Sequence, residues 1–169
     1  MKRIQPEIGD LKNLRVLNMG NNPISSITFN IGNLKNLEDL LLNDCQIKRM
    51  PNAIGGMENL RFLGLNHNPL KTLPNGICDL SNLSRLFLYN TQLEKLPNCM
   101  GNLKKLERFE VYNNPNLKEL PNSLGNLESL KVLDIVGNPI EKLPKKLCDR
   151  WRENKIQIFA NKELNELCD

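Results

Sequence analysis

Few residues of this chain have side chains that could carry out catalysis. His67 is the one histidine among 169 residues, and a histidine works as a general base only beside a nucleophile or an orienting acid. The sequence shows no glycine-rich phosphate loop, no H-E-x-x-H and no clustered C-x-x-C. We therefore expect a solvated polar side chain at His67, and neither an enzyme activity nor a cofactor or metal within this chain.

The five cysteines are odd in number, and they stand where other copies of the repeat described below carry Asn, Gly or Ser. They are Cys45, Cys78, Cys99, Cys148 and Cys168. This placement favours small, mostly buried, reduced thiols over a disulfide framework or a zinc cluster. Because free thiols persist in reducing compartments, we expect a cytoplasmic location.

Charge and hydropathy exclude several classes of partner. The formal net charge of +4 comes from 23 basic and 19 acidic residues that are scattered along the chain, so no basic arm for nucleic acid or anionic lipid is present. Nowhere do 18 apolar residues run together, which argues against a membrane span. Asn82-Leu83-Ser84 meets the N-glycosylation rule, which matters only in a secreted chain. We therefore expect that the chain binds neither nucleic acid nor a membrane, and that it has no small-molecule substrate.

A repeat organises the chain. A leucine recurs at intervals of 23 residues, four times, and then of 24, at Leu14, Leu37, Leu60, Leu83, Leu106 and Leu130. Between these leucines a second phrase recurs, in the forms MPNAIG, LPNGIC, LPNCMG, LPNSLG and LPKKLC. A fixed period of this length indicates stacked structural repeats, each of which buries its apolar face against its neighbours.

Each repeat predicts one short strand with one buried side. Leu86 and Leu88 alternate with the exposed positions around Phe87, which is the period of two that a strand produces. A parallel strand needs the repeats before and after it as hydrogen-bonding partners. We predict seven such strands, the last at about 156–158 in a terminal cap. Proline at the head of each recurring phrase suits the first turn of a short helix on the opposite side.

The two phrases together resemble the leucine-rich repeat, L-x-x-L-x-L-x-x-N-x-L, in its 23-residue form with L-P-x-x-I-G, which is found in cytosolic and bacterial proteins. The resemblance covers nearly the whole chain and implies an α/β fold, a right-handed solenoid with a curved parallel sheet on the concave face and short helices or turns on the convex face. We expect one domain, 1–169, with an N-terminal half-repeat at 1–10, six repeats at about 11–143 and a C-terminal cap at 144–169. Because residues 1–10 leave the first strand's edge unshielded, we expect an upstream continuation of the chain or self-association.

A column of mostly asparagine residues marks the turn after each strand. Its members are Asn22, Cys45, Asn68, Thr91, Asn114, Asn138 and Asn161. Asparagine can both donate and accept, so it can satisfy the backbone groups of a loop that has left the sheet. We expect Asn22, Asn68, Asn114, Asn138 and Asn161 to be structural.

The concave face shows what the repeat does not require. Its first column is Val16, Asp39, Phe62, Arg85, Arg108, Val132 and Lys155. The second column is Asn18, Leu41, Gly64, Phe87, Glu110, Asp134 and Gln157, and the third is Gly20, Asn43, Asn66, Tyr89, Tyr112, Val136 and Phe159. Aromatic residues with arginine at the centre of a concave surface are typical of an interface hot spot. We therefore predict a partner-binding surface made of Phe62, Arg85, Phe87, Tyr89, Arg108, Glu110 and Tyr112.

These observations favour a non-catalytic module that binds another protein through its concave face. In one setting it is a bacterial effector that is secreted into a host cytosol and acts on host proteins. In another it is a scaffold or the ligand-sensing region of an intracellular immune or signalling receptor. The alternative from a different class is the substrate-recognition part of a larger enzyme, such as a ubiquitin ligase, whose catalytic residues lie outside this chain.

Overall fold

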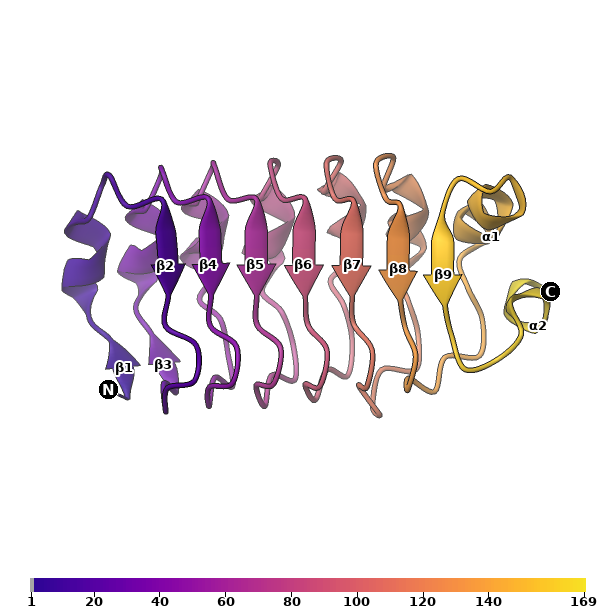
Figure 1. The fold of residues 1–169 in the computed structure, drawn as a ribbon, viewed down its shortest axis with the longest axis horizontal. Helices are drawn as coiled ribbons and strands as arrows, with labels where there is room; N and C mark the ends of the chain where they lie inside the picture. The colour runs from indigo at the N-terminus through magenta and orange to yellow at the C-terminus, as the bar shows by residue number, and fades with distance from the viewer. Residues whose placement is uncertain (1) are drawn as a thin grey trace.

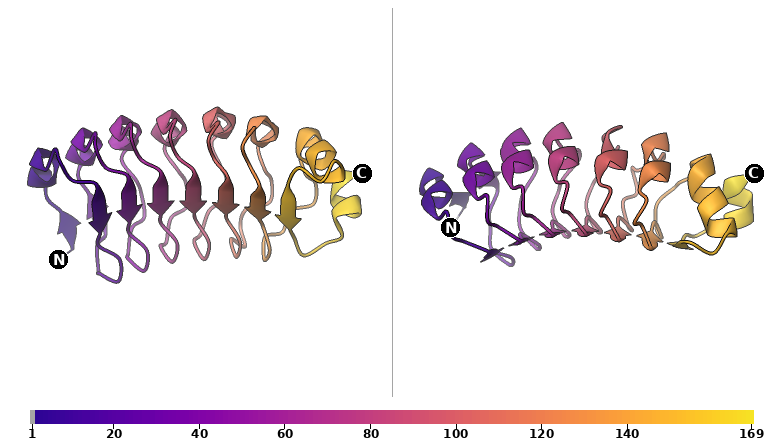
Figure 2. Two further views of the ribbon diagram at one scale, coloured as in Figure 1. Left: turned by 45° about the horizontal axis from the view of Figure 1, so that its top comes forward. Right: turned by 90° about the horizontal axis from the view of Figure 1, so that it is seen from above.

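The computed structural model describes residues 2–169 and shows a solenoid that advances by one strand per repeat (Figure 1). Within these residues the main sheet has seven parallel strands, in the same order as in the chain. The strands are β2 (Val16–Asn18), β4 (Asp39–Leu41), β5 (Phe62–Gly64), β6 (Arg85–Phe87), β7 (Arg108–Glu110), β8 (Val132–Asp134) and β9 (Gln157–Phe159). They lie on the inner side of a gently curved molecule, with the helices on the outer side (Figure 2).

Short helices occupy the convex side. Five are 3₁₀ helices of the recurring pattern, η2 (Phe29–Asn33), η3 (Asn52–Gly56), η4 (Asn75–Asp79), η5 (Met100–Asn102) and η6 (Asn122–Asn126). Pro51, Pro74 and Pro121 stand at the N-caps of η3, η4 and η6 in extended conformation, where a residue without an N–H loses no hydrogen bond. In η2 the cap is Thr28, whose hydroxyl accepts from the N–H of Asn30. Neighbouring helices of the convex side stack closely, and this favours glycine at Gly101 on η5. A Cβ at that position would lie 2.3 Å from the carbonyl oxygen of Ser123 in the next coil.

The core is a continuous stack of aliphatic side chains between the sheet and the helices. The strand register aligns the middle residue of each strand with that of the next, in the row Leu17, Leu40, Leu63, Leu86, Phe109, Leu133 and Ile158. All but Leu17 are buried. Each fully buried side chain of this size contributes about 1.5–3 kcal/mol. The repeat therefore sets the fold by placing one such residue at the same level in every coil.

The two ends of the solenoid differ. At the N-terminal end, β1 (Arg3–Ile4) pairs with β3 (Ser26–Ile27) beside η1 (Pro6–Asp10), but β2 has a strand neighbour on one side only within residues 2–169. Val16 on β2 is 54% exposed. At the C-terminal end, α1 (Lys145–Arg152) and α2 (Leu164–Cys168) flank β9 (Figure 1). Neither α-helix has the length and apolar character needed to cross a membrane.

The columns predicted from the sequence are wrong at the last strand, β9. Gln157, not Lys155, pairs with Val132, and Phe159, not Gln157, pairs with Asp134. The step from Val132 to Gln157 is thus 25 residues, because the return segment of this coil is the eight-residue helix α1 and not a short 3₁₀ turn. The shift by two residues moves Phe159 beside Asp134 on the concave face, where its side chain is 49% exposed.

Candidate functional site

Four aromatic side chains meet on the concave side of β5, β6 and β7. These four, Phe62, Phe87, Tyr89 and Tyr112, are named here the aromatic patch. The Phe62 and Phe87 rings meet edge to face with centroids 4.9 Å apart, and Phe87 lies 6.2 Å from Tyr89. Tyr89 and Tyr112 stack in parallel at 4.5 Å. Each ring is only partly buried, so the patch keeps an aromatic surface open to solvent.

Charged side chains border the aromatic patch. The guanidinium of Arg85 lies 4.6 Å from the centroid of the Phe62 ring, a cation–π contact. Nε of Arg108 donates to Oε1 of Glu110 at 2.6 Å, and Glu110 is 9% exposed, so this pair is partly withdrawn from water. Five of the seven residues predicted to bind a partner thus lie on one side of β5, β6 and β7, and Tyr89 and Tyr112 lie two residues beyond the ends of β6 and β7. Their role in binding stays a prediction.

The surroundings of the two phenols disfavour their ionised forms. Partial burial raises the pKa of Tyr89 above its ordinary value, and the negative charges of Glu110 and Asp44 act in the same direction. Partial burial also raises the pKa of Tyr112, with the charges of Tyr89, Glu110 and Asp134 adding to the effect. Both phenols therefore stay protonated at neutral pH, in the form that can donate as well as accept a hydrogen bond.

We expect both tyrosines to ionise at higher pH in the folded protein than in denaturant. The chain has two tyrosines, both in the patch, so the ultraviolet absorbance of tyrosinate reports on this site alone. The folded state holds the phenolic protons more tightly than the unfolded state. Unfolding therefore releases protons above about pH 10, and stability falls as pH rises through the ordinary tyrosine pKa. A titration that superimposes on the denatured one would contradict this packing.

His67 belongs to a column with left-handed backbone conformation. Asn21, Asp44, His67, Asn90 and Asn113 all have positive φ, between 52° and 57°, and Gly137 follows at 77°. Asn, Asp, His and Gly are the residues that tolerate this conformation best, which explains the composition of the column. The positive φ at this turn therefore explains why a histidine is accepted at position 67, without any catalytic role.

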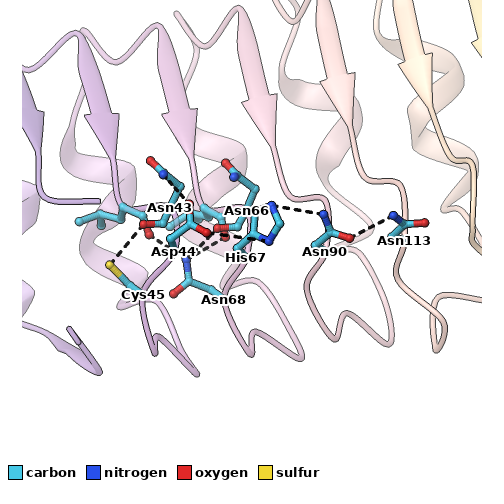
Figure 3. A network of polar contacts seen from close by, with 10 residues as sticks. Asn43, Asp44, Cys45, Asn66, His67, Asn68, Asn90 and Asn113 are labelled. Carbon is cyan, nitrogen blue, oxygen red and sulfur yellow. Dashed lines mark hydrogen bonds and ion pairs between the residues drawn. The ribbon is translucent and has the colours of Figure 1, made fainter. Parts of the chain in front are cut away.

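The side chains of this column also connect neighbouring coils (Figure 3). Nδ2 of Asn113 donates to Oδ1 of Asn90 at 3.0 Å, and Nδ2 of Asn90 lies 3.3 Å from Nε2 of His67. Nδ1 of His67 is 4.0 Å from Asp44, and its ring meets Tyr89 edge to face at 5.4 Å. His67 is thus a border residue of the aromatic patch, a contact that its place in the repeat did not reveal. Among residues 2–169 no group of three or more His, Cys, Asp or Glu side chains is placed to hold a metal ion.

The asparagine column makes the hydrogen bonds that join each loop to the sheet. Nδ2 of Asn68 donates to the carbonyls of Leu42 and Leu65 at 2.8 and 3.0 Å, while Oδ1 accepts from the N–H of Ile47 at 2.9 Å. Asn114 repeats this pattern two coils further on. Nδ2 of Asn138 donates to the carbonyl of Val111 at 2.9 Å. These three side chains are buried.

The other members of the column differ according to position. Asn22 and Asn161 lie in the end coils and are exposed. Asn22 donates to the carbonyls of Met19 and Gly20, and Asn161 accepts from the N–H of Gly137. Thr91 donates its hydroxyl to the carbonyl of Leu88, and the Cys45 thiol lies 3.6 Å from the carbonyl oxygens of Met19 and Asn43. No buried side-chain nitrogen or oxygen in residues 2–169 lacks a hydrogen-bond partner.

A second asparagine column was missed in the sequence. Nδ2 of Asn36, Asn59 and Asn82 each donates to a carbonyl of the preceding coil, on Lys12, Lys35 and Glu58, at 2.8 to 2.9 Å. The three asparagines are spaced by 23 residues, so the signal was present at the turn before each strand. Asn82, of the glycosylation triplet, is engaged in this column and also accepts from Nζ of Lys105.

The expectation of reduced, unpaired cysteines is wrong for four of the five. Cys78 on η4 is bonded to Cys99 just before η5, with Cα atoms 5.7 Å apart, and Cys148 on α1 is bonded to Cys168 on α2 at 5.6 Å. Cys45 is free and buried. Both bonds join neighbouring coils, because a separation of 20 or 21 residues is close to one repeat. The argument for a reducing compartment therefore loses its basis.

Comparison with known proteins agrees with this architecture. The family model described as Leucine Rich Repeat matches residues 13–34 and 59–80. No curated protein matches the chain. Among solved structures, the Leptospira interrogans LRR protein LIC12759 is 33% identical with a TM-score of 0.62, over 93% of this chain and 45% of that one.

Two plant receptors are also similar. The Arabidopsis receptor kinase HAESA, solved with the peptide hormone IDA and the co-receptor SERK1, is 29% identical with a TM-score of 0.71, over 82% of this chain and 26% of that one. The plant peptide hormone receptor RGFR1, solved with RGF2, is 27% identical with a TM-score of 0.68, over 93% of this chain and 30% of that one. The chain thus spans less than half of each of these three proteins. Its matched repeats, its parallel solenoid and these neighbours identify it as a leucine-rich repeat protein.

Proposed function

We propose that this chain binds a protein or peptide partner through the aromatic patch and the charged residues beside it. The observation that supports the proposal is the patch itself. The core is built almost entirely from aliphatic side chains, with Phe109 as its buried aromatic ring, so packing of the fold does not require four rings on the concave surface. Rigid aromatic side chains beside arginine form the centre of many protein interfaces because they bury a large area at little entropic cost.

The similar structures support two settings for this function. The likeness to the Leptospira protein supports a bacterial protein, for which an effector role in a host cell is our proposal. The likeness to HAESA and RGFR1 supports the ligand-sensing region of a receptor, since both were solved with peptide hormones. The two disulfides support an oxidising compartment, where such bonds persist, and therefore favour a ligand-sensing region outside the cell over an effector in a reducing host cytosol.

Truncation of the patch tests the proposed function. We expect Phe87→Ala and Tyr89→Ala each to weaken partner binding by about 2 kcal/mol, roughly 30-fold, because each removes a ring from the centre of the interface. The partner is first captured by the wild-type chain and identified, and its affinity for each variant is then measured by calorimetry. Thermal unfolding of the variants verifies that the fold is intact.

Phe29→Ala is the matched control for these variants. Phe29 is 73% exposed and lies on η2, on the convex side, so its loss removes an equal ring from the opposite face. The Phe29→Ala variant should bind the partner with the same affinity as the wild type. Equal affinity of the Phe87→Ala and Tyr89→Ala variants as well would show that the concave patch is not the binding surface.

A further inference from the structure

Within residues 2–169, the concave face carries three charged side chains without an ion-pair partner. Its charged residues there are Asp39, Arg85, Arg108, Glu110 and Asp134, and among residues 2–169 only Arg108 and Glu110 of this set form an ion pair, with each other. None of the ion pairs formed within residues 2–169 includes Asp39, Arg85 or Asp134. Arg85 is exposed, and both aspartates are partly exposed. The fold itself does not neutralise these three charges.

The register places the three charges in an alternating series along the solenoid. Asp39 on β4 and Arg85 on β6 both pair with Phe62 on β5, so they lie at the same level and two strands apart. Asp134 lies on β8, two strands beyond β6 and two residues further along the strand. With strands about 4.8 Å apart and about 3.3 Å per residue, the steps from Arg85 are about 10 Å and about 12 Å. The series reads negative, positive, negative, across the aromatic patch.

Neighbouring groups orient two of the three charged side chains, Arg85 and Asp134. The contact with the Phe62 ring holds the guanidinium of Arg85 in place, while its N–H groups remain free for a carboxylate. Oδ1 of Asp134 accepts from the N–H of Val136 at 3.1 Å, which orients the carboxylate. Phe159 on β9 lies beside Asp134 and is half exposed, so this carboxylate is bordered by apolar surface.

We propose that the partner of this face is an extended peptide segment that runs across the strands from β4 to β8. An acidic side chain of the segment pairs with Arg85, and a basic side chain on each side of it pairs with Asp39 and Asp134. An extended chain advances about 3.3 Å per residue and points successive side chains to opposite faces, so the basic residues stand four positions from the acidic one, on the side that meets the sheet. An apolar side chain between them packs on the aromatic patch. This inference deepens the proposed function and depends on it.

Selection from a random peptide library displayed on phage tests this inference. We expect the wild-type chain to enrich peptides with a central acidic residue and a basic residue four positions to either side. A synthetic peptide of that consensus should bind Arg85→Glu and Asp134→Lys at least about tenfold more weakly than the wild type, because each reversal places like charges together. Lysine in place of the acidic residue of the peptide should restore binding to Arg85→Glu.

Lys118→Glu supplies the matched charge change away from the face. Lys118 is exposed, lies on the return side of the coil and forms no ion pair within residues 2–169, so this variant should bind the consensus peptide as the wild type does. Enriched peptides without the charge pattern, or affinities that the two reversals leave unchanged, would overturn the inference. The inference would also be overturned if the chain enriched no peptide from the library but bound glycans on an array. If Phe87→Ala and Tyr89→Ala still abolished peptide binding while the reversals had no effect, the proposed function would stand without this partner.

Discussion

Reduction of the two disulfides is expected to lower the free energy of unfolding by about 6 kcal/mol, about 3 kcal/mol for each bond. Each bond closes a loop of 20 or 21 residues in the unfolded chain, and a loop of this length loses entropy of that size when it is crosslinked. Domains of this kind have total stabilities of about 5–15 kcal/mol. Denaturant unfolding with and without reductant measures the difference.

Three variants separate the two bonds from the free thiol. The pair Cys78→Ser with Cys99→Ser, and the pair Cys148→Ser with Cys168→Ser, should each lose about half of the stability that reductant removes. Cys45→Ser should remain as sensitive to reductant as the wild type, because Cys45 is unpaired. Alkylation in denaturant, read by mass spectrometry, should find one free thiol in unreduced protein. Five alkylated thiols would show that the bonds do not form.

Replacement of Asn68 by leucine is expected to cost about 3 kcal/mol or more. The change leaves the carbonyls of Leu42 and Leu65 and the N–H of Ile47 without their side-chain partner, in a position that is 2% exposed. Each buried polar group without a hydrogen bond costs about 1–3 kcal/mol, and leucine supplies no donor or acceptor. Because stability in a solenoid depends on the contacts between neighbouring coils, the loss affects both coils that Asn68 joins.

Asn22→Leu is the control for Asn68→Leu. Asn22 occupies the same place in its coil but is exposed, so water can replace its bonds to the carbonyls of Met19 and Gly20. We expect a change of less than about 1 kcal/mol for Asn22→Leu. Thermal or denaturant unfolding of the two variants beside the wild type gives the comparison. Equal losses at both positions would mean that the column is not stabilised by the hydrogen bonds described here.

The asparagine and cysteine positions show how far the sequence allowed the structure to be predicted. Asn68 could be assigned because a period of 23 residues places it at the same turn as Asn114, and the chemistry of an amide suits a loop that leaves a sheet. Pairing of Cys78 with Cys99 could not be assigned, because a disulfide requires a particular distance and direction between two Cβ atoms. The repeat gives the coil on which a residue lies, but not the direction of its side chain toward the next coil.

The candidate site, too, could be predicted from the sequence only in part. The seven predicted residues could be placed on one face by alternation along each strand and by a constant period between strands. The position of Phe159 could not, because the length of the last return segment depends on whether it folds as a 3₁₀ turn or as helix α1. The lack of ion-pair partners for Asp39, Arg85 and Asp134 likewise depends on side-chain distances, which a pattern of residue types does not contain.

The pattern of residue types was enough to predict the solenoid, its parallel strands, its buried row of mostly aliphatic residues and the face that carries the aromatic patch. It was enough because the period of the repeat and the alternation within a strand are properties of the backbone, which a linear pattern of apolar residues reproduces. The tertiary structure decided the two disulfides, the register of β9, the contact of His67 with Tyr89 and the three unpaired charges. These depend on how side chains of neighbouring coils meet at distances of a few ångströms, and only the folded coil sets those distances.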